Sequence, residues 1–135
     1  MSHEFAGGCL CGAVRFRAAG EGTDATVCHC QTCRRASGAP MVAWVTFPLG
    51  GFAFTQGDPV RYRSSPPVTR TFCGRCGTAL TYARDGAETI DVTTISLDRA
   101  DDLPPRDHIW TSHSPRWLRA SESLPRFPRG RDMGE

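Results

Sequence analysis

Cys28-His29-Cys30-Gln31-Thr32-Cys33 is the stretch that organises this chain, because it puts three thiols within six residues. Thiolates this close together repel one another unless a cation lies between them. Zinc prefers thiolate ligands and usually takes four ligands in a tetrahedron. Three protein ligands leave one coordination position open, as in catalytic zinc sites. The stretch therefore predicts a metal centre at which chemistry takes place.

The other four cysteines occur as two pairs. Cys9 and Cys11 form a C-x-C turn flanked by glycines, and Cys73 and Cys76 form a C-x-x-C turn followed by glycine. Two such half-sites together make a closed four-thiolate site, which is typical of structural zinc. This division uses all seven cysteines as four plus three.

A rival division joins Cys30 and Cys33 with Cys73 and Cys76 as a zinc ribbon. It would leave the remaining three cysteines without a shared site. We prefer the first division, because a tight triad wraps an ion without closing a long loop. The sequence alone leaves the second division open.

Length, charge and cysteine number bound the class of protein. The chain has 135 residues, 39% hydrophobic residues and a net charge of +2, which are values of a single globular domain. Near-neutral charge argues against nucleic acid as a partner. Seven cysteines cannot all pair as disulfides, and we see no apolar leader and no apolar run of membrane-spanning length. We therefore expect a cytoplasmic protein, without a membrane partner, whose reduced thiols bind metal.

Alternating and apolar runs predict short strands near residues 14–17, 41–47, 52–54, 60–63, 80–83 and 88–97. A short helical turn is expected over 33–38, ended by Gly38, and another near Pro115. The three tryptophans are expected in the core. The fold class that follows is mainly β, with small antiparallel sheets stapled by metal. We expect one domain over residues 5–127 and a flexible tail over 128–135.

The cysteine motifs resemble the glutathione-dependent formaldehyde-activating enzyme family, to which centromere protein V also belongs. The motifs that carry the resemblance are Gly8-Cys9-Leu10-Cys11-Gly12, Cys28-His29-Cys30-x-x-Cys33-Arg34-Arg35 and Phe72-Cys73-x-x-Cys76-Gly77-Thr78. The resemblance implies a β-tent fold and two zinc ions per chain. It implies a structural zinc on Cys9, Cys11, Cys73 and Cys76, and a catalytic zinc on Cys28, Cys30 and Cys33.

The same resemblance implies an activity. The founding reaction of the family condenses glutathione with formaldehyde to S-(hydroxymethyl)glutathione, and is classed as a carbon–sulfur lyase in the reverse direction. The expected partners are glutathione or another small thiol, together with an aldehyde. Arg34 and Arg35 follow the triad directly, and we expect one of them to offset negative charge or bind a glutathione carboxylate. A solvated helix face explains each arginine equally well.

His29 is expected to play a structural part. In an extended C-H-C segment, alternate side chains point in opposite directions, so His29 should face away from an ion held by Cys28 and Cys30.

Two functions of other classes stay open from the sequence. The first is a zinc-dependent binding module for protein or nucleic acid, for which centromere protein V is a precedent. Retention on DNA that depends on salt would favour it. The second is a thiol redox sensor built on the triad, which reversible metal release under mild peroxide would favour.

Overall fold

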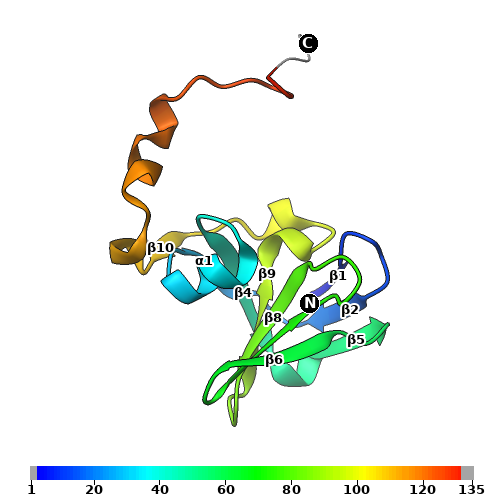
Figure 1. Cartoon of the computed structure of the whole chain (residues 1–135). Coiled ribbons are helices and arrows are strands. Elements are labelled where there is room, and N and C mark those ends of the chain that lie inside the picture. The colour runs from blue at the N-terminus through cyan, green and yellow to red at the C-terminus, as the bar shows by residue number, and fades with distance from the viewer. Residues whose placement is uncertain (1–2, 132–135) are drawn as a thin grey trace.

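The computed structural model of the chain describes residues 3–131, and ten strands in this range form two sheets (Figure 1). The three-stranded sheet has the order β1 (Glu4–Gly8), β2 (Arg15–Ala19), β5 (Phe52–Gln56). The seven-stranded sheet has the order β10 (Asp107–Ile109), β3 (Thr23–Cys28), β4 (Val42–Pro48), β9 (Thr89–Thr93), β8 (Ala79–Arg84), β7 (Val68–Phe72), β6 (Val60–Ser65). Only β10 and β3 pair in parallel among these strands. The prediction of a mainly β fold is confirmed.

One face of the large sheet packs on the small sheet and makes the core. Val45 and Phe47 of β4 are fully buried there, together with Phe16 of β2. The rings of Phe5 and Phe47 have centroids 5.8 Å apart and join the two sheets. Because successive side chains of a strand point to opposite faces, the residues between these core positions point the other way.

That other face carries a row of polar side chains across four neighbouring strands. Thr46 of β4 lies opposite Asp91 of β9, Asp91 lies opposite Tyr82 of β8, and Tyr82 lies opposite Arg70 of β7. Tyr82 reaches this face although Leu80, two residues earlier, is in the core. The pairing of β7 with β8 slips between Thr71 and Phe72, which inserts one extra residue into β8.

One α-helix and five 3₁₀ turns complete the described chain. The helix α1 (Gln31–Ser37) ends at Gly38, whose φ of 69° is left-handed and whose N–H donates to the Arg34 carbonyl at 2.8 Å. The 3₁₀ turns are η1 (Leu49–Gly51), η2 (Thr94–Ser96), η3 (Ala100–Asp102), η4 (Thr111–His113) and η5 (Arg116–Ser123). The strand expected over 88–97 is shorter than predicted, because η2 turns the chain directly after Thr93.

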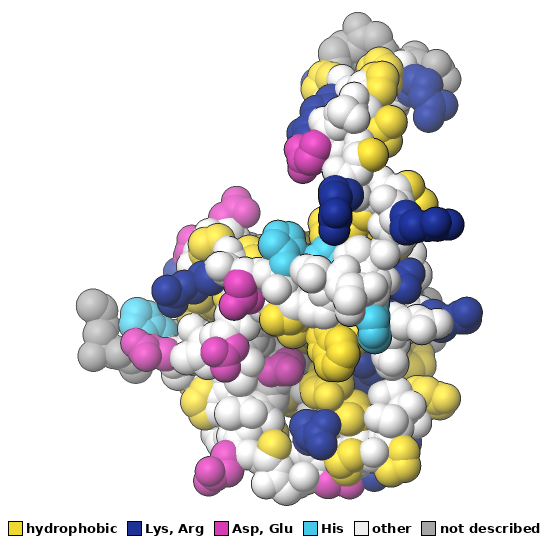
Figure 2. Space-filling view, turned by 90° about the vertical axis from the view of Figure 1, so that its left-hand side faces the viewer, with side chains coloured by type: hydrophobic (Ala, Val, Ile, Leu, Met, Phe, Trp, Pro, Cys, Tyr) yellow, Lys and Arg dark blue, Asp and Glu magenta, His cyan; other side chains and the backbone are white. Residues whose placement is uncertain are grey.

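The chain after β10 leaves the body as an arm, which we define as residues 114–131 (Figure 1). Figure 2 shows the arm standing away from the body, with arginine and hydrophobic side chains along it. Trp117, which was expected in the core, is 62% exposed on η5. The expected flexible tail lies partly outside the described residues, since 132–135 are beyond them. Among the helices within residues 3–131, none has the length and apolar character needed to cross a membrane.

Candidate metal centres

The first cysteine cluster joins the turn between β1 and β2 to the turn between β7 and β8. Its members, Cys9, Cys11, Cys73 and Cys76, have Sγ atoms that all lie within 4.8 Å of one another. The Sγ atom of Cys11 lies 3.6 Å from that of Cys9 and 3.7 Å from that of Cys73. Four sulfurs around zinc at about 2.3 Å stand about 3.8 Å apart, so this spacing fits a tetrahedral ion. It is far too long for a disulfide.

Backbone N–H groups prepare the first cluster for negative sulfur. The N–H of Val14 donates to Cys9 Sγ at 3.2 Å, and the N–H of Arg75 donates to Cys73 Sγ at 3.3 Å. Hydrogen bonds from the Thr78 hydroxyl and backbone lower the pKa of the Cys76 thiol to about 5. A backbone hydrogen bond at Ala13 acts to lower the pKa of Cys11, but burial and the neighbouring thiols outweigh it and raise this pKa to about 11. The thiolate form, which binds a metal, is therefore favoured at Cys76 but not at Cys11.

The second cluster is the cysteine triad, Cys28, Cys30 and Cys33, at the junction of β3 and α1. The three Sγ atoms again lie within 4.8 Å of one another. Cys28 ends the strand, and Cys30 caps the helix by accepting the N–H of Cys33 on its Sγ at 3.2 Å. The structure thus divides the cysteines as four and three, and does not bring Cys30 and Cys33 to the first cluster, as a zinc ribbon would require.

Without a metal, burial favours the neutral thiol at two of the three triad positions. Burial raises the pKa of the Cys28 thiol to about 12, and burial also raises the pKa of Cys33. Burial acts to raise the pKa of Cys30 too, but hydrogen bonding with Cys33 outweighs it and the pKa is lowered. A coordinated metal would deprotonate all three thiols. Within residues 3–131, no fourth His, Cys, Asp or Glu joins this group.

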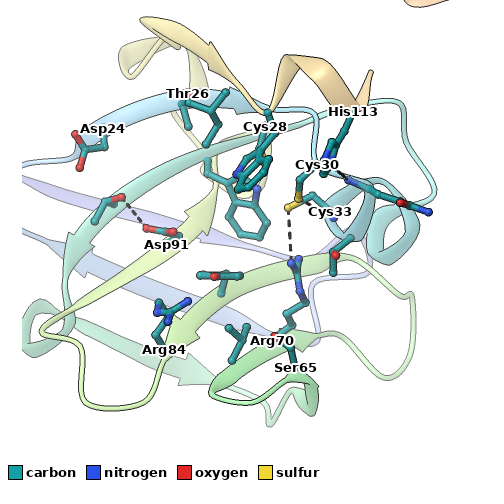
Figure 3. Close-up of a pocket in the computed structure, with 18 residues that line it drawn as sticks. Asp24, Thr26, Cys28, Cys30, Cys33, Ser65, Arg70, Arg84, Asp91 and His113 are labelled. Atoms are coloured by element: carbon teal, nitrogen blue, oxygen red, sulfur yellow. Dashed lines mark hydrogen bonds between the residues drawn. The ribbon is translucent and has the colours of Figure 1, made fainter. Parts of the chain in front are cut away.

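The triad lies at one end of a pocket of about 490 Å³ on the polar face of the large sheet (Figure 3). This volume is within the range of small-molecule sites, about 300–1,000 Å³. Trp44, which is 7% exposed, and Tyr82 pack edge to face with ring centroids 6.0 Å apart and line the pocket. Trp110 also lines the pocket but is 57% exposed, so it is not the core residue that was expected.

Arg70 places a positive charge beside the triad. Its Nη2 lies 3.7 Å from Cys33 Sγ, and its Nε donates to the Ser64 hydroxyl at 3.0 Å. Its guanidinium lies over the Tyr82 ring, 5.1 Å from the centroid. These contacts hold the side chain between the sheet and the triad, as Figure 3 shows. Arg70 could not be selected from the sequence, because it lies 37 residues from Cys33.

The end of the pocket away from the triad carries charges of both signs. Figure 3 shows Asp24, Asp91 and Arg84 there. Asp91 accepts a hydrogen bond from the Thr46 hydroxyl at 2.6 Å. Burial raises the pKa of the Asp91 carboxyl, and the negative charge of Asp24 raises it further. Asp24 has φ of 52° and lies within an irregularity in the pairing of β3 with β4, between Thr23 and Thr26.

The histidines take separate positions. His29 is buried away from the pocket, and its Nε2 lies 2.9 Å from Nδ1 of His108. His113 lines the pocket, and its Nδ1 accepts the backbone N–H of Gln31 at 3.2 Å. This acceptor role leaves the proton of the neutral ring on Nε2.

Neither Arg34 nor Arg35 lines the pocket that contains the triad. Arg35 lines a neighbouring hollow of the same sheet, and Arg34 has a buried Nε with no hydrogen-bond partner among the described residues. Their expected roles stay predictions.

This chain is similar to a known family, to a curated protein and to solved structures. A family profile described as glutathione-dependent formaldehyde-activating enzyme matches residues 4–113. A Schizosaccharomyces pombe protein named an uncharacterized lyase is 36% identical over 87 residues, which are 59% of this chain and 58% of that protein. The chain therefore matches little more than half of this relative. A crystal structure of a Rhodobacter sphaeroides protein is similar with a TM-score of 0.62 and 26% identity, over 76% of this chain and 98% of that one.

Proposed function

Because this chain belongs to the glutathione-dependent formaldehyde-activating enzyme family, we propose that it is a zinc-dependent enzyme of the carbon–sulfur lyase type. It condenses glutathione, or another small thiol, with formaldehyde or a related aldehyde. The product with glutathione and formaldehyde is S-(hydroxymethyl)glutathione. It works in the cytoplasm, where a reducing environment keeps its seven free cysteines reduced.

The observation that carries this proposal is the place of the triad. Three sulfurs gather at the end of a pocket large enough for a small molecule, whereas the four-cysteine cluster does not line it. Four protein ligands close a zinc site, and three leave a position for a ligand from solvent. We therefore assign the zinc on Cys9, Cys11, Cys73 and Cys76 to structure, and the zinc on Cys28, Cys30 and Cys33 to catalysis.

The reaction is the addition of a thiol to a carbonyl. Cys28, Cys30 and Cys33 would hold the zinc, which would supply an open coordination position and lower the pKa of a substrate thiol there. The sulfur then forms a bond to the carbonyl carbon, and the carbonyl oxygen takes up a proton to become the hydroxyl of the product. The residues around the triad have to offset negative charge and donate a hydrogen bond to this oxygen.

Arg70 lies where it can offset negative charge at the triad. The three triad thiolates and one zinc carry a charge of about −1 by simple counting, and a thiolate from the substrate would add to it. The guanidinium beside Cys33 reduces the repulsion between the triad and an anionic ligand. Arg34 and Arg35 remain proposed for charge balance or for a substrate carboxylate at a greater distance.

His113 lies where it can donate a hydrogen bond to the carbonyl oxygen. Its Nε2 carries the proton, since Nδ1 accepts from Gln31, and the ring lines the pocket near the triad. It can therefore donate a hydrogen bond to the oxygen that develops charge.

Spectroscopy on the cobalt-substituted protein tests the proposal directly. Thiolate-to-cobalt charge-transfer bands report each added sulfur, so millimolar glutathione or 2-mercaptoethanol should change the spectrum. NMR exchange between formaldehyde, glutathione and their adduct should then be faster with the zinc protein than without it. An unchanged cobalt spectrum with both thiols would instead favour a non-catalytic binding module.

A further inference from the structure

We propose that the end of the pocket away from the triad binds the amino-acid head of the thiol ligand. Asp91 receives its ammonium group, and Arg84 receives the carboxylate beside it. The ligand class is a thiol whose sulfur and α-amino group are about 10 Å apart, as in a γ-glutamyl thiol. This inference rests on the proposed function and identifies the amino-acid head as the part of the ligand that this chain recognises.

The spacing follows from the sheet. Asp91 lies opposite Tyr82, and Tyr82 lies opposite Arg70, so Asp91 and Arg70 are two strands apart on the same face. Neighbouring strands are about 4.8 Å apart, which puts the two backbones roughly 10 Å from each other. Arg70 also reaches Cys33, and the triad and Asp91 line the same pocket, so a ligand that joins them has to extend across about two strands.

The charges at this end of the pocket form no ion pair with other residues that the structure describes. Among residues 3–131, neither Asp91 nor Arg84 takes part in an ion pair within 4.0 Å. In the described part of the chain, the Asp91 carboxylate accepts a side-chain hydrogen bond from the Thr46 hydroxyl alone, and Asp24 adds a second negative charge beside it. A partly buried carboxylate without a cation is stabilised when an ammonium group binds. Arg84, exposed on the last residue of β8, offers a planar fork for a carboxylate.

The length selects among thiols. In glutathione, eight bonds join the sulfur to the γ-glutamyl amino nitrogen, which is about 10 Å when extended. In free cysteine, three bonds join the same two atoms, about 4 Å, so its ammonium group cannot reach Asp91 while its sulfur is at the triad. Trp44 and Tyr82 form the apolar wall between the two ends.

The test compares thiols on the full chain with cobalt in place of zinc. Dissociation constants are read from the charge-transfer bands for glutathione, γ-glutamylcysteine, N-acetylglutathione and 2-mercaptoethanol. Glutathione and γ-glutamylcysteine should bind alike. N-acetylglutathione lacks the ammonium group and should bind about tenfold more weakly or worse, because hydrogen bonds between charged groups contribute that much. The Asp91→Asn variant should lose this preference and still bind 2-mercaptoethanol as the native chain does.

Matched variants separate the site from general charge. Asp58→Asn removes an acid whose side chain is 94% exposed, and it should keep the full preference for glutathione. If Asp91→Asn does not fold, Asp24→Asn and Arg84→Gln replace it. Asp24 is exposed and asparagine tolerates its positive φ, so a smaller preference is expected there. Arg84→Gln should weaken glutathione binding about tenfold and leave 2-mercaptoethanol unchanged.

The outcomes distinguish the two proposals. The amino-acid subsite is overturned if the native chain binds glutathione and N-acetylglutathione equally. It is also overturned if Asp91→Asn prefers glutathione over N-acetylglutathione as strongly as the native chain does. In both cases, binding of 2-mercaptoethanol would still support the proposed function. If no thiol, 2-mercaptoethanol included, changes the bands, the proposed function fails and the subsite fails with it.

Discussion

Replacing one cysteine in each cluster should have very different effects on stability. Cys76→Ser opens the four-sulfur cluster, which holds together turns 62 residues apart in the sequence between Cys11 and Cys73. A crosslink of this span restricts the unfolded chain by about 4 kcal/mol, whereas one across the triad restricts it by only about 2 kcal/mol. Cys73 is also 1% exposed and belongs to the main core. Binding of a structural zinc contributes about 10–16 kcal/mol to folding, which is as large as the total stability of a domain, about 5–15 kcal/mol, so Cys76→Ser should leave the chain largely unfolded.

Cys33→Ser should instead leave a folded protein, with a melting temperature lower by about 5–10 °C. Each of the two variants replaces one sulfur atom by oxygen, so they serve as controls for each other. Circular dichroism gives the fold and the melting temperature, and metal analysis gives the zinc content of each protein. Cys33→Ser should retain about one zinc per chain. A folded Cys76→Ser protein beside an unfolded Cys33→Ser protein would mean that the structural and catalytic sites have been assigned the wrong way round.

Further outcomes follow from the same contacts. The purified native chain should contain two zinc ions, and a mild chelator should remove the triad zinc first; a single tightly bound ion at full occupancy would contradict the four-plus-three division. Arg70→Met should weaken glutathione binding to the cobalt protein about tenfold, because a hydrogen bond to a charged group is lost. The same variant should bind neutral imidazole as tightly as the native chain does. Equal losses of affinity for both ligands would exclude a charge effect. Asp98→Asn should lower the free energy of unfolding at pH 7 by no more than about 1 kcal/mol, since the Arg15–Asp98 pair is half-exposed. Hydrogen bonding to Arg15 lowers the pKa of Asp98 in the folded state, so its contribution is present above the unfolded pKa of about 4 and is lost as the pH falls further. Urea unfolding of both proteins should therefore converge at acidic pH; a constant difference would show that the ion pair is not its source.

The metal clusters could be predicted because their information is local. Each half-site is a short motif with fixed spacing, and only a few divisions of seven cysteines are possible. The helical turn closed by Gly38 was predictable for the same reason, since glycine favours the left-handed φ that ends a helix. These features need no knowledge of which strands are neighbours.

The pocket could not be predicted, because it depends on lateral pairing. Asp91 and Arg70 reach one face only through the order of β9, β8 and β7. A simple alternation of side chains would put Leu80 and Tyr82 on the same face of the sheet. The slip in β8 instead puts Leu80 in the core and Tyr82 in the lining of the pocket. β1 escaped prediction too, because its run EFAGG contains two glycines and no clear alternation. The prediction that Trp110 and Trp117 lie in the core was wrong, because aromatic residues are often but not always buried. Both residues follow the last strand of the sheet and are exposed.

Strand β9 carries two independent sets of residues. Ile90 and Val92 belong to the core, while Asp91 between them faces the pocket. A substitution at Asp91 can therefore change which thiol is accepted without repacking the interior. Relatives could diverge in substrate through this single position while their folding stays the same. Libraries that vary Asp91 and Arg84 together should contain mostly folded proteins, and are a practical starting point for redirecting the pocket to thiols with other head groups.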